Sequence, residues 1–115
     1  MTVTDLVHCF AEITDRQGQA LKTYQIKQYK KLYGEMMDVA NELKSRNGDQ
    51  RRALMILYQH PAPKVRLMAA HMTLALAYPE ARTVMQNIVD RQERPFAGDA
   101  AGTLRNLDSG FYKPT

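Results

Sequence analysis

The sequence is poor in the residues that disulfide-bonded, metal-binding and membrane proteins depend on. It has 115 residues, with one cysteine (Cys9), three histidines and no tryptophan. A single cysteine excludes an internal disulfide and fits a reducing compartment. No apolar run approaches the ~18–20 residues that span a bilayer. The first ten residues lack the basic leader and cleavage site of a signal peptide. We therefore expect one cytoplasmic domain, residues 1–115, with no part in a membrane.

Motifs that carry chemistry are equally scarce. His8 and Cys9 are adjacent, so on a helix their side chains diverge by about 100° and form no nucleophile–base pair. No His-x-x-x-His, Cys-x-x-Cys or Glu-x-x-His spacing indicates a metal site. Gly98 and Gly102 have no strand before them, as a phosphate-binding loop requires. We expect no catalytic residue, no metal and no cofactor, and predict that the protein is not an enzyme.

Apolar residues recur at helical spacing along the whole chain, and no segment alternates as a strand would. The clearest seam, with steps of three and four residues, is Ile26, Tyr29, Tyr33, Met36, Ala40 and Leu43. This pattern is typical of a helix packed lengthwise on its neighbours. The fold class is therefore all-α. The expected helices are 4–17, 20–46, 50–59, 63–77, 79–91 and 97–107, followed by a tail at 108–115.

Several helix ends can be read directly from residue types. Thr2 and Asp5 have the spacing of a capping box. Asp49 can cap the third helix, after a break at 47–48. Pro63 and Pro79 each suit the first turn of a helix, since proline fits there and clashes within one. We expect a weaker break at 17–19, around a glycine.

A faint internal repeat links two parts of the chain at an offset of 31 residues. Residues Ala53, Leu54, Leu57, Val65, Ala69, Ala70 and Leu76 correspond to Val84, Met85, Ile88, Phe96, Ala100, Ala101 and Leu107. A proline recurs at the turn within each unit, Pro63 and Pro95. One hairpin cannot bury its apolar face, so hairpins stack. With the first two helices as a pair, we expect about three stacked hairpins.

The segment HPAPKVRLMAA, residues 60–70, resembles the turn and second helix of HEAT repeats. The resemblance implies a short, right-handed HEAT/armadillo-like stack, a scaffold for binding that seldom houses chemistry. It also implies that Arg66 helps to hold the turn. The pattern departs from the usual one at His60, which stands where an acid is often found. This puts an acid–arginine bridge within the turn in doubt.

The whole chain also resembles a small bacterial family of all-helical proteins, domain-of-unknown-function family twenty-nineteen. The matching motifs are the helix 29–46 with its KLYGEM run, the HPAPKVRLMAA turn, and the closing GDAAGTLRNLDSG with a final Lys-Pro. These motifs are structural. They specify a fold and leave the function open.

The most suggestive polar feature is the segment 22–33, with four lysines, three tyrosines and no acid. Lysines interleaved with aromatic rings can bind single-stranded nucleic acid. On a helix, however, Tyr29 and Tyr33 share the apolar seam, while Lys27 and Lys31 fall on another face. We therefore favour buried tyrosines and a solvated lysine face.

These observations favour a protein–protein interaction module with an unknown protein partner, of the adaptor or immunity type. The candidate partner-binding surface consists of Lys64, Arg66, His71, Arg82 and Arg105. The alternative is binding of a nucleic-acid backbone, because residues 49–115 carry nine Lys or Arg against six acids. A third possibility is a homodimer, if part of the 26–43 seam is exposed.

Overall fold

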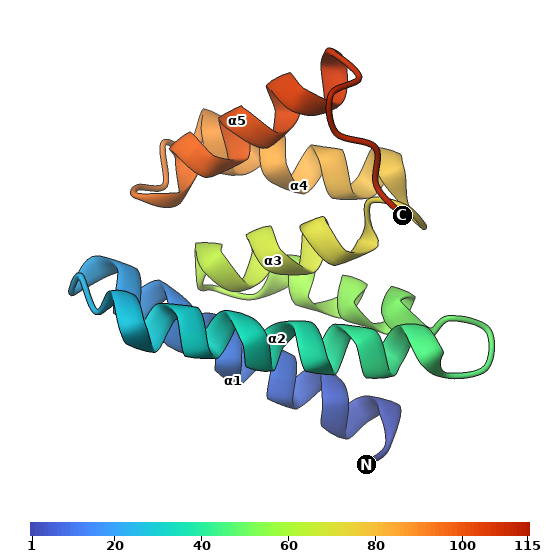
Figure 1. Cartoon of the computed structure of the whole chain (residues 1–115). Helices are drawn as coiled ribbons and strands as arrows, with labels where there is room; N and C mark the ends of the chain where they lie inside the picture. Colours follow the sequence, from blue (N-terminus) through green and yellow to red (C-terminus); the bar gives the residue numbers. More distant parts are fainter.

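The computed structural model describes residues 1–115 and contains six helices and no strand, which confirms the all-α prediction. In chain order the elements are α1 (Val3–Lys22), α2 (Ile26–Ser45), η1 (Gln50–Gln59), α3 (Pro63–Thr73), α4 (Tyr78–Asp90) and α5 (Phe96–Asp108) (Figure 1). The element η1 is a 3₁₀ helix and the other five are α-helices. None of the helices combines the length and apolar character that crossing a membrane requires.

The helices pack as three consecutive pairs. α1 lies against α2, η1 against α3, and α4 against α5. The pairs follow one another in space in chain order, with α3 between the first and third pairs (Figure 1). Each pair therefore buries its apolar side against the next. The result is a body of 35 × 31 × 25 Å.

Helix α3 is the centre of this arrangement, because it contacts α1, η1, α4 and α5. Its buried residues are Lys64, Val65, Arg66, Leu67, Met68, Ala69, Ala70 and Thr73. Because α3 packs on four helices, it is buried over most of its circumference and has no broad polar side, unlike a helix at the surface. The small side chains of Ala69 and Ala70, both fully buried, let those neighbours approach closely.

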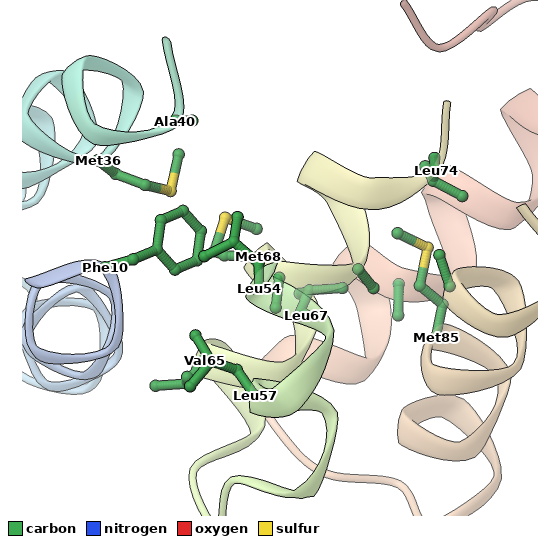
Figure 2. Packing of buried hydrophobic residues seen from close by; sticks show 14 of the residues in the cluster. Phe10, Met36, Ala40, Leu54, Leu57, Val65, Leu67, Met68, Leu74 and Met85 are labelled. Carbon is green, nitrogen blue, oxygen red and sulfur yellow. The ribbon is translucent and has the colours of Figure 1, made fainter. Parts of the chain in front are cut away.

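The core runs through all three pairs (Figure 2). Phe10 of α1 and Met36 of α2 meet Met68 on one side of α3. Leu74 and Met85 close the core on the side of α4. Most positions that the sequence pairs at an offset of 31 are buried in both hairpins, including Leu54 with Met85 and Val65 with Phe96.

The predicted helix caps and first-turn prolines are present in the structure. The main-chain N–H of Thr2 donates to Asp5 Oδ2 at 3.0 Å, and Asp5 N–H donates to Thr2 Oγ1 at 3.1 Å, which completes the capping box. Asp49 accepts a bond from the N–H of Arg51 at the start of η1. Pro63 is the first residue of α3 and Pro79 lies in the first turn of α4.

The predicted break at 17–19 is wrong, since α1 continues through it to Lys22. A Cβ added at Gly18 would lie 3.1 Å from Lys64 Cβ and 3.4 Å from Phe96 Cζ. The glycine therefore serves close packing of α1 on α3, and it does not end the helix. The chain reverses instead at Tyr24, where φ is 57°.

The seam predicted for residues 26–43 is also displaced. The buried residues of α2 are Leu32, Met36, Ala40 and Leu43. Ile26 and Tyr33 are 52% and 47% exposed, and Tyr29 is half-buried. α2 packs on α1 and η1, but no helix covers the side that carries Ile26 and Tyr33. The helical period of the pattern was predicted correctly. The prediction that a neighbouring helix covers Ile26 and Tyr33 was wrong.

The type of one helix and the end of another differ from the prediction, although the bounds of the helix at 50–59 are as expected. The third helix winds as a 3₁₀ helix over all of 50–59, and α3 ends at Thr73, four residues before the predicted end at 77. Residues 74–77 form a turn in which the N–H groups of Leu76 and Ala77 both donate to Thr73 O. This turn brings Pro79 to the start of α4.

We expect Gly18→Ala to destabilise the protein by about 1–3 kcal/mol, because the new methyl group overpacks the α1–α3 contact. Gly34→Ala is the matched control: nothing lies within 4 Å of its Cβ position in α2. Alanine there should stabilise by about 0.5–1 kcal/mol through helix propensity. Urea unfolding of the two variants checks both signs. Equal stabilisation by both would contradict the close approach.

Candidate functional site

The second helices of the three pairs, α2, α3 and α5, lie on one side of the molecule (Figure 1). Polar contacts connect them across this side, from Tyr29 on α2 through Lys64 and His71 on α3 to Thr103 on α5. The carboxylate of Asp99, near the start of α5, influences three of these groups electrostatically. The face therefore has a polar cluster, defined as Tyr29, Lys64, His71, Asp99 and Thr103.

Lys64 is the least usual member of the cluster, because its residue is only 2% exposed. Its Nζ donates to the hydroxyl of Tyr29 at 3.2 Å and lies 5.3 Å from the centre of that ring. It takes part in none of the four ion pairs of the structure. Burial lowers the pKa of Lys64, and the more distant carboxylate of Asp99 opposes this shift.

His71 lies about two turns further along α3 and is partly exposed. Its Nε2 is 3.4 Å from Thr103 Oγ1. Burial lowers the pKa of His71, the carboxylate of Asp99 raises it, and the charge of Lys64 lowers it. Burial is the largest of these effects, so the imidazole is neutral at pH 7.

Beyond His71, a hollow of about 230 Å³ opens between α2, α3 and the tail. We call it the inner hollow. Its lining comprises Met37, Ala40, Asn41, Lys44, Arg51, His71, Met72, Ala75, Tyr112, Pro114 and Thr115. The lining mixes flexible apolar side chains with hydrogen-bonding groups and contains no Asp or Glu. Such a surface can receive a peptide better than it can carry out a reaction.

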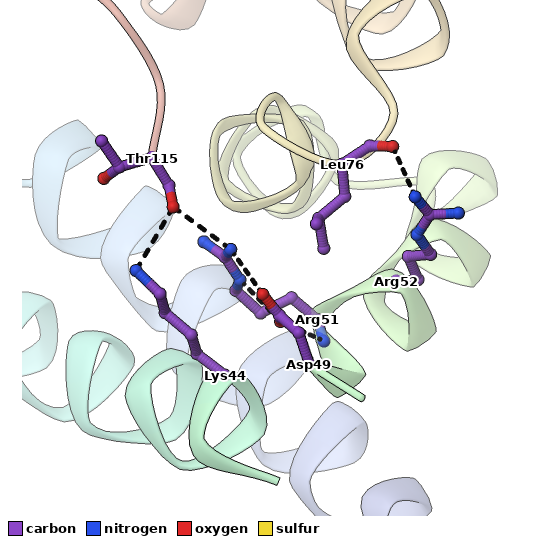
Figure 3. Close-up of polar contacts among 6 residues, drawn as sticks. All are labelled: Lys44, Asp49, Arg51, Arg52, Leu76 and Thr115. Carbon is purple, nitrogen blue, oxygen red and sulfur yellow. Dashed lines mark hydrogen bonds and ion pairs between the residues drawn. The ribbon is translucent and has the colours of Figure 1, made fainter. Parts of the chain in front are cut away.

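The tail after α5 crosses back towards the first two helix pairs (Figure 1) and contributes Tyr112, Pro114 and Thr115 to the lining of the inner hollow. Tyr112 N–H donates to Asn106 O at 3.1 Å. At the far end, Lys44 Nζ and Arg51 Nη2 both donate to Thr115 O, at 3.3 and 3.4 Å (Figure 3). Tyr112 lines the hollow, whereas Phe111 is 84% exposed.

Arg51 is held in place for this contact by Asp49. Its Nε and Nη2 donate to the two carboxylate oxygens at 2.9 and 2.7 Å (Figure 3). The guanidinium lowers the pKa of Asp49 through these hydrogen bonds. Lys44, Arg51 and Thr115 were not predicted as site residues, because their contacts join residues 71 and 64 positions apart in the chain. No local sequence motif predicts contacts between residues so far apart in the chain.

Arg66, by contrast, has a structural role in the turn between η1 and α3. Its Nε donates to His60 O at 2.8 Å and its Nη2 to Pro61 O at 3.4 Å, so it holds the turn. The same Nη2 pairs with Glu93 Oε1 at 2.9 Å, in the turn before α5. The acid that pairs with Arg66 therefore comes from the turn between α4 and α5.

The five residues of the predicted partner-binding surface have different surroundings. Lys64 and Arg66 are buried, 2% and 8% exposed. Arg82 is paired with Asp108 at 2.9 Å. Arg105 follows Thr103 by two positions, about 200° around α5, so it points away from His71. Of the five residues, only His71 lines the inner hollow.

The end of the molecule around the α1–α2 turn is strongly basic. Residues 16–34 contain Arg16, Lys22, Lys27, Lys30 and Lys31, and no acid. Tyr24, at the tip of the turn, is 86% exposed. This basic end is separate from the inner hollow, with which it shares no lining residue. No three His, Cys, Asp or Glu side chains come together as metal ligands would.

Comparison with known proteins identifies the fold and adds no reaction. A family model described as "Domain of unknown function (DUF2019)" matches residues 4–108. The crystal structure of the protein RPA1889 from Rhodopseudomonas palustris CGA009 is similar, with 46% sequence identity and a TM-score of 0.97. The similarity covers 100% of this chain and 95% of that one. No curated protein sequence matches the chain.

We expect Arg66→Met to destabilise the protein by about 3 kcal/mol, because it leaves Glu93 and two turn carbonyls without their partner. Arg82→Met removes a more exposed ion pair, with Asp108, and should cost less than about 1 kcal/mol. Thermal or urea unfolding of both variants measures the difference. Similar losses would contradict the role of Arg66 in joining the two turns.

Titration of His71 followed by NMR should give a pKa below 6.5. Asp99→Asn should lower it further, since the carboxylate favours the imidazolium, and Lys64→Met should raise it. Because the pKa is lower in the folded chain, the unfolded chain takes up the proton first. The stability contribution of His71 is therefore complete above pH 6.5 and falls as the pH drops below it. Unchanged values in both variants would show that the cluster is not coupled.

Proposed function

Because the chain belongs to the family described as Domain of unknown function (DUF2019), which is defined here by a fold and no reaction, we propose that it is a non-enzymatic protein-binding module. It acts as an adaptor or immunity-type partner, and an extended segment of another protein binds in the inner hollow. The proposal includes a cytoplasmic location.

The observation that carries this proposal is that the hollow already accommodates an extended segment. Residues 112–115 have no regular secondary structure and lie along α2 and α3. The polar contact of this segment with the lining runs through a main-chain atom, Thr115 O, which accepts from Lys44 and Arg51, while Tyr112 N–H bonds back to Asn106 O of α5. Contacts of this kind hold peptides of varied sequence, while pockets for side chains give selectivity.

The lining of the hollow supports binding of a side chain as well as a backbone. Met37 and Met72 are flexible and polarisable, and they adapt to apolar groups of different shape. Asn41 and His71 bring hydrogen-bonding groups beside them. A surface that is apolar at its centre and polar at its edge is the usual composition of a protein interface.

The HEAT-like interpretation of the stack belongs to the same proposal. Three packed hairpins, a proline at the start of α3 and an arginine that holds the turn support it. In such stacks each hairpin contacts mainly its neighbours, and one side of the stack is free for binding. The side of α2, α3 and α5 would be that binding side.

The absence of an enzymatic role is also part of the proposal. Lys64 has a lowered pKa, as some catalytic amines do, but its residue is covered and its Nζ is engaged by Tyr29. A substrate would have to displace packed side chains to reach the amine. His71 is accessible, but its neighbours Thr103 and Asp99 give it no nucleophile.

A second candidate function is nucleic-acid binding, supported by the basic end at residues 16–34. Tyr24 and Tyr33 are exposed there beside lysines, against our expectation that the tyrosine of the seam is buried. Exposed rings and cations together suit single-stranded nucleic acid. The same exposed seam residues, Ile26 and Tyr33, meet the condition we set for a homodimer. Both remain alternatives to the partner segment.

The test is an affinity pull-down from a lysate of the native cells at low and high salt. We expect one protein to be retained at high salt by the wild type and lost with Met37→Arg, which places a charge in the inner hollow. Ile56→Arg is the control, because Ile56 is exposed on η1 beside a separate hollow next to α1. Nucleic acid recovered only at low salt would favour the alternative. Equal retention by both variants would contradict binding in the hollow.

A further inference from the structure

We propose that Lys44 and Arg51 form a carboxylate-binding site at the end of the inner hollow. Its ligand is an acidic residue of an extended partner peptide, placed next to an apolar residue that fills the hollow. The chain's own segment 109–115 occupies this site in cis and is displaced by the peptide. The inference rests on the proposed function, and it names the chemistry of the partner.

The cationic groups of this site meet at Thr115 O. Lys44 and Arg51 contribute two positive charges, and Asp49, which is bonded to Arg51 and also feels the charge of Lys44, contributes one negative charge. Asp and Glu are absent from the lining of the hollow. The three side chains therefore sum to one net positive charge, and a carboxylate placed where Thr115 O lies would complete the pairing.

The site is also ordered before any partner binds. The Arg51 side chain is only 10% exposed, and both oxygens of Asp49 fix its guanidinium plane. Its Nη2 is the atom that reaches Thr115 O. A fixed guanidinium loses little freedom on binding, so more of the interaction energy appears as affinity. Lys44 is exposed on α2 and can adjust to the second oxygen of a carboxylate.

The tail is an incomplete occupant. It leaves about 230 Å³ open beneath Tyr112 and Pro114, several times the ~30 Å³ that one water molecule takes in the liquid. Phe111 points away from the hollow and is largely exposed. A peptide with a larger apolar side chain in this space would add contacts with Met37, Met72 and Ala75, which line it.

The tail also fixes the order of the two features in the partner. Pro114 lines the hollow, and the next residue supplies the oxygen bound by Lys44 and Arg51. The partner sequence is therefore an apolar residue followed closely by Asp or Glu. Approach of an acidic segment is favoured by the net charge of +4.

The probes are two peptides with the sequence of residues 110–115, changed at the last two positions. One is acetyl-Gly-Phe-Tyr-Lys-Leu-Glu-amide, with leucine in place of Pro114 and glutamate in place of Thr115. The other has glutamine instead of glutamate, so the two differ by one carboxylate. Each is titrated into the full chain at low salt, with the amide signals of Tyr112 and Lys44 followed by NMR.

We expect the glutamate peptide to bind about tenfold more tightly than the glutamine peptide, as one charge-assisted contact predicts. Binding should also shift the Tyr112 amide towards its disordered position and speed its hydrogen exchange. Lys44→Met should abolish the tenfold preference of the chain for the glutamate peptide over the glutamine peptide. Lys27→Met is the matched control, on the same helix about 25 Å away, and should leave the preference intact.

Equal affinity of the two peptides, or binding that leaves Tyr112 in place, would overturn the inference. Displacement of the tail by a ten-nucleotide oligothymidylate, but not by the glutamate peptide, would also overturn the inference. The pull-down separates this inference from the proposed function. A partner lost with Met37→Arg but fully retained by Lys44→Met would keep the protein-binding function and exclude the carboxylate site. A tenfold preference for the glutamate peptide without any captured partner would keep the carboxylate site and contradict the protein-binding function.

Discussion

The structure depends on the burial of most of α3. Four helices pack around it, so eight of its eleven residues are buried and must suit an interior, while His71 and Met72 line the inner hollow. Ala69 and Ala70 satisfy this by being small. Its polar residues satisfy it by finding partners: Lys64 bonds to Tyr29, Arg66 to the turn at His60 and Pro61, and Thr73 Oγ1 to Ala69 O. Unpaired, each would cost about 1–3 kcal/mol or more.

Features set by neighbouring residues were predictable from the sequence, and features set by distant ones were not. The capping box at Thr2 and the prolines at 63 and 79 act within one turn, so residue type is enough to predict them. Gly18 was wrongly predicted to break the helix. A glycine is needed there because Lys64 lies close to it across the α1–α3 contact. Ile26 and Tyr33 fit the period of the seam, but burial also needs a neighbour. Gln17 is fully buried with an unpaired amide, which no pattern would predict.

The candidate site was harder to predict than the fold, because charge does not reveal burial. Lys64 and Arg66 were selected as basic residues near a turn, yet both are interior. The residues that gather at the inner hollow come from α2, η1, α3 and the tail. Asp49 was correctly assigned as a cap, and that local role is what orients Arg51. Asp49 thus has a local role, capping η1, that the sequence predicts. Its second role, orienting Arg51 towards the tail, depends on the completed fold.

The relation of the tail to the fold explains why a displaceable segment is physically reasonable here. The core cluster ends at Leu107, the family match ends at 108, and no residue of 109–115 is buried. Releasing the tail therefore exposes little apolar surface and breaks few bonds. The lining contributed by α2, η1 and α3 is held by the core and stays in place. The rigid stack supplies the hollow, the tail fills only part of it, and a better-fitting peptide needs to overcome only that weak attachment.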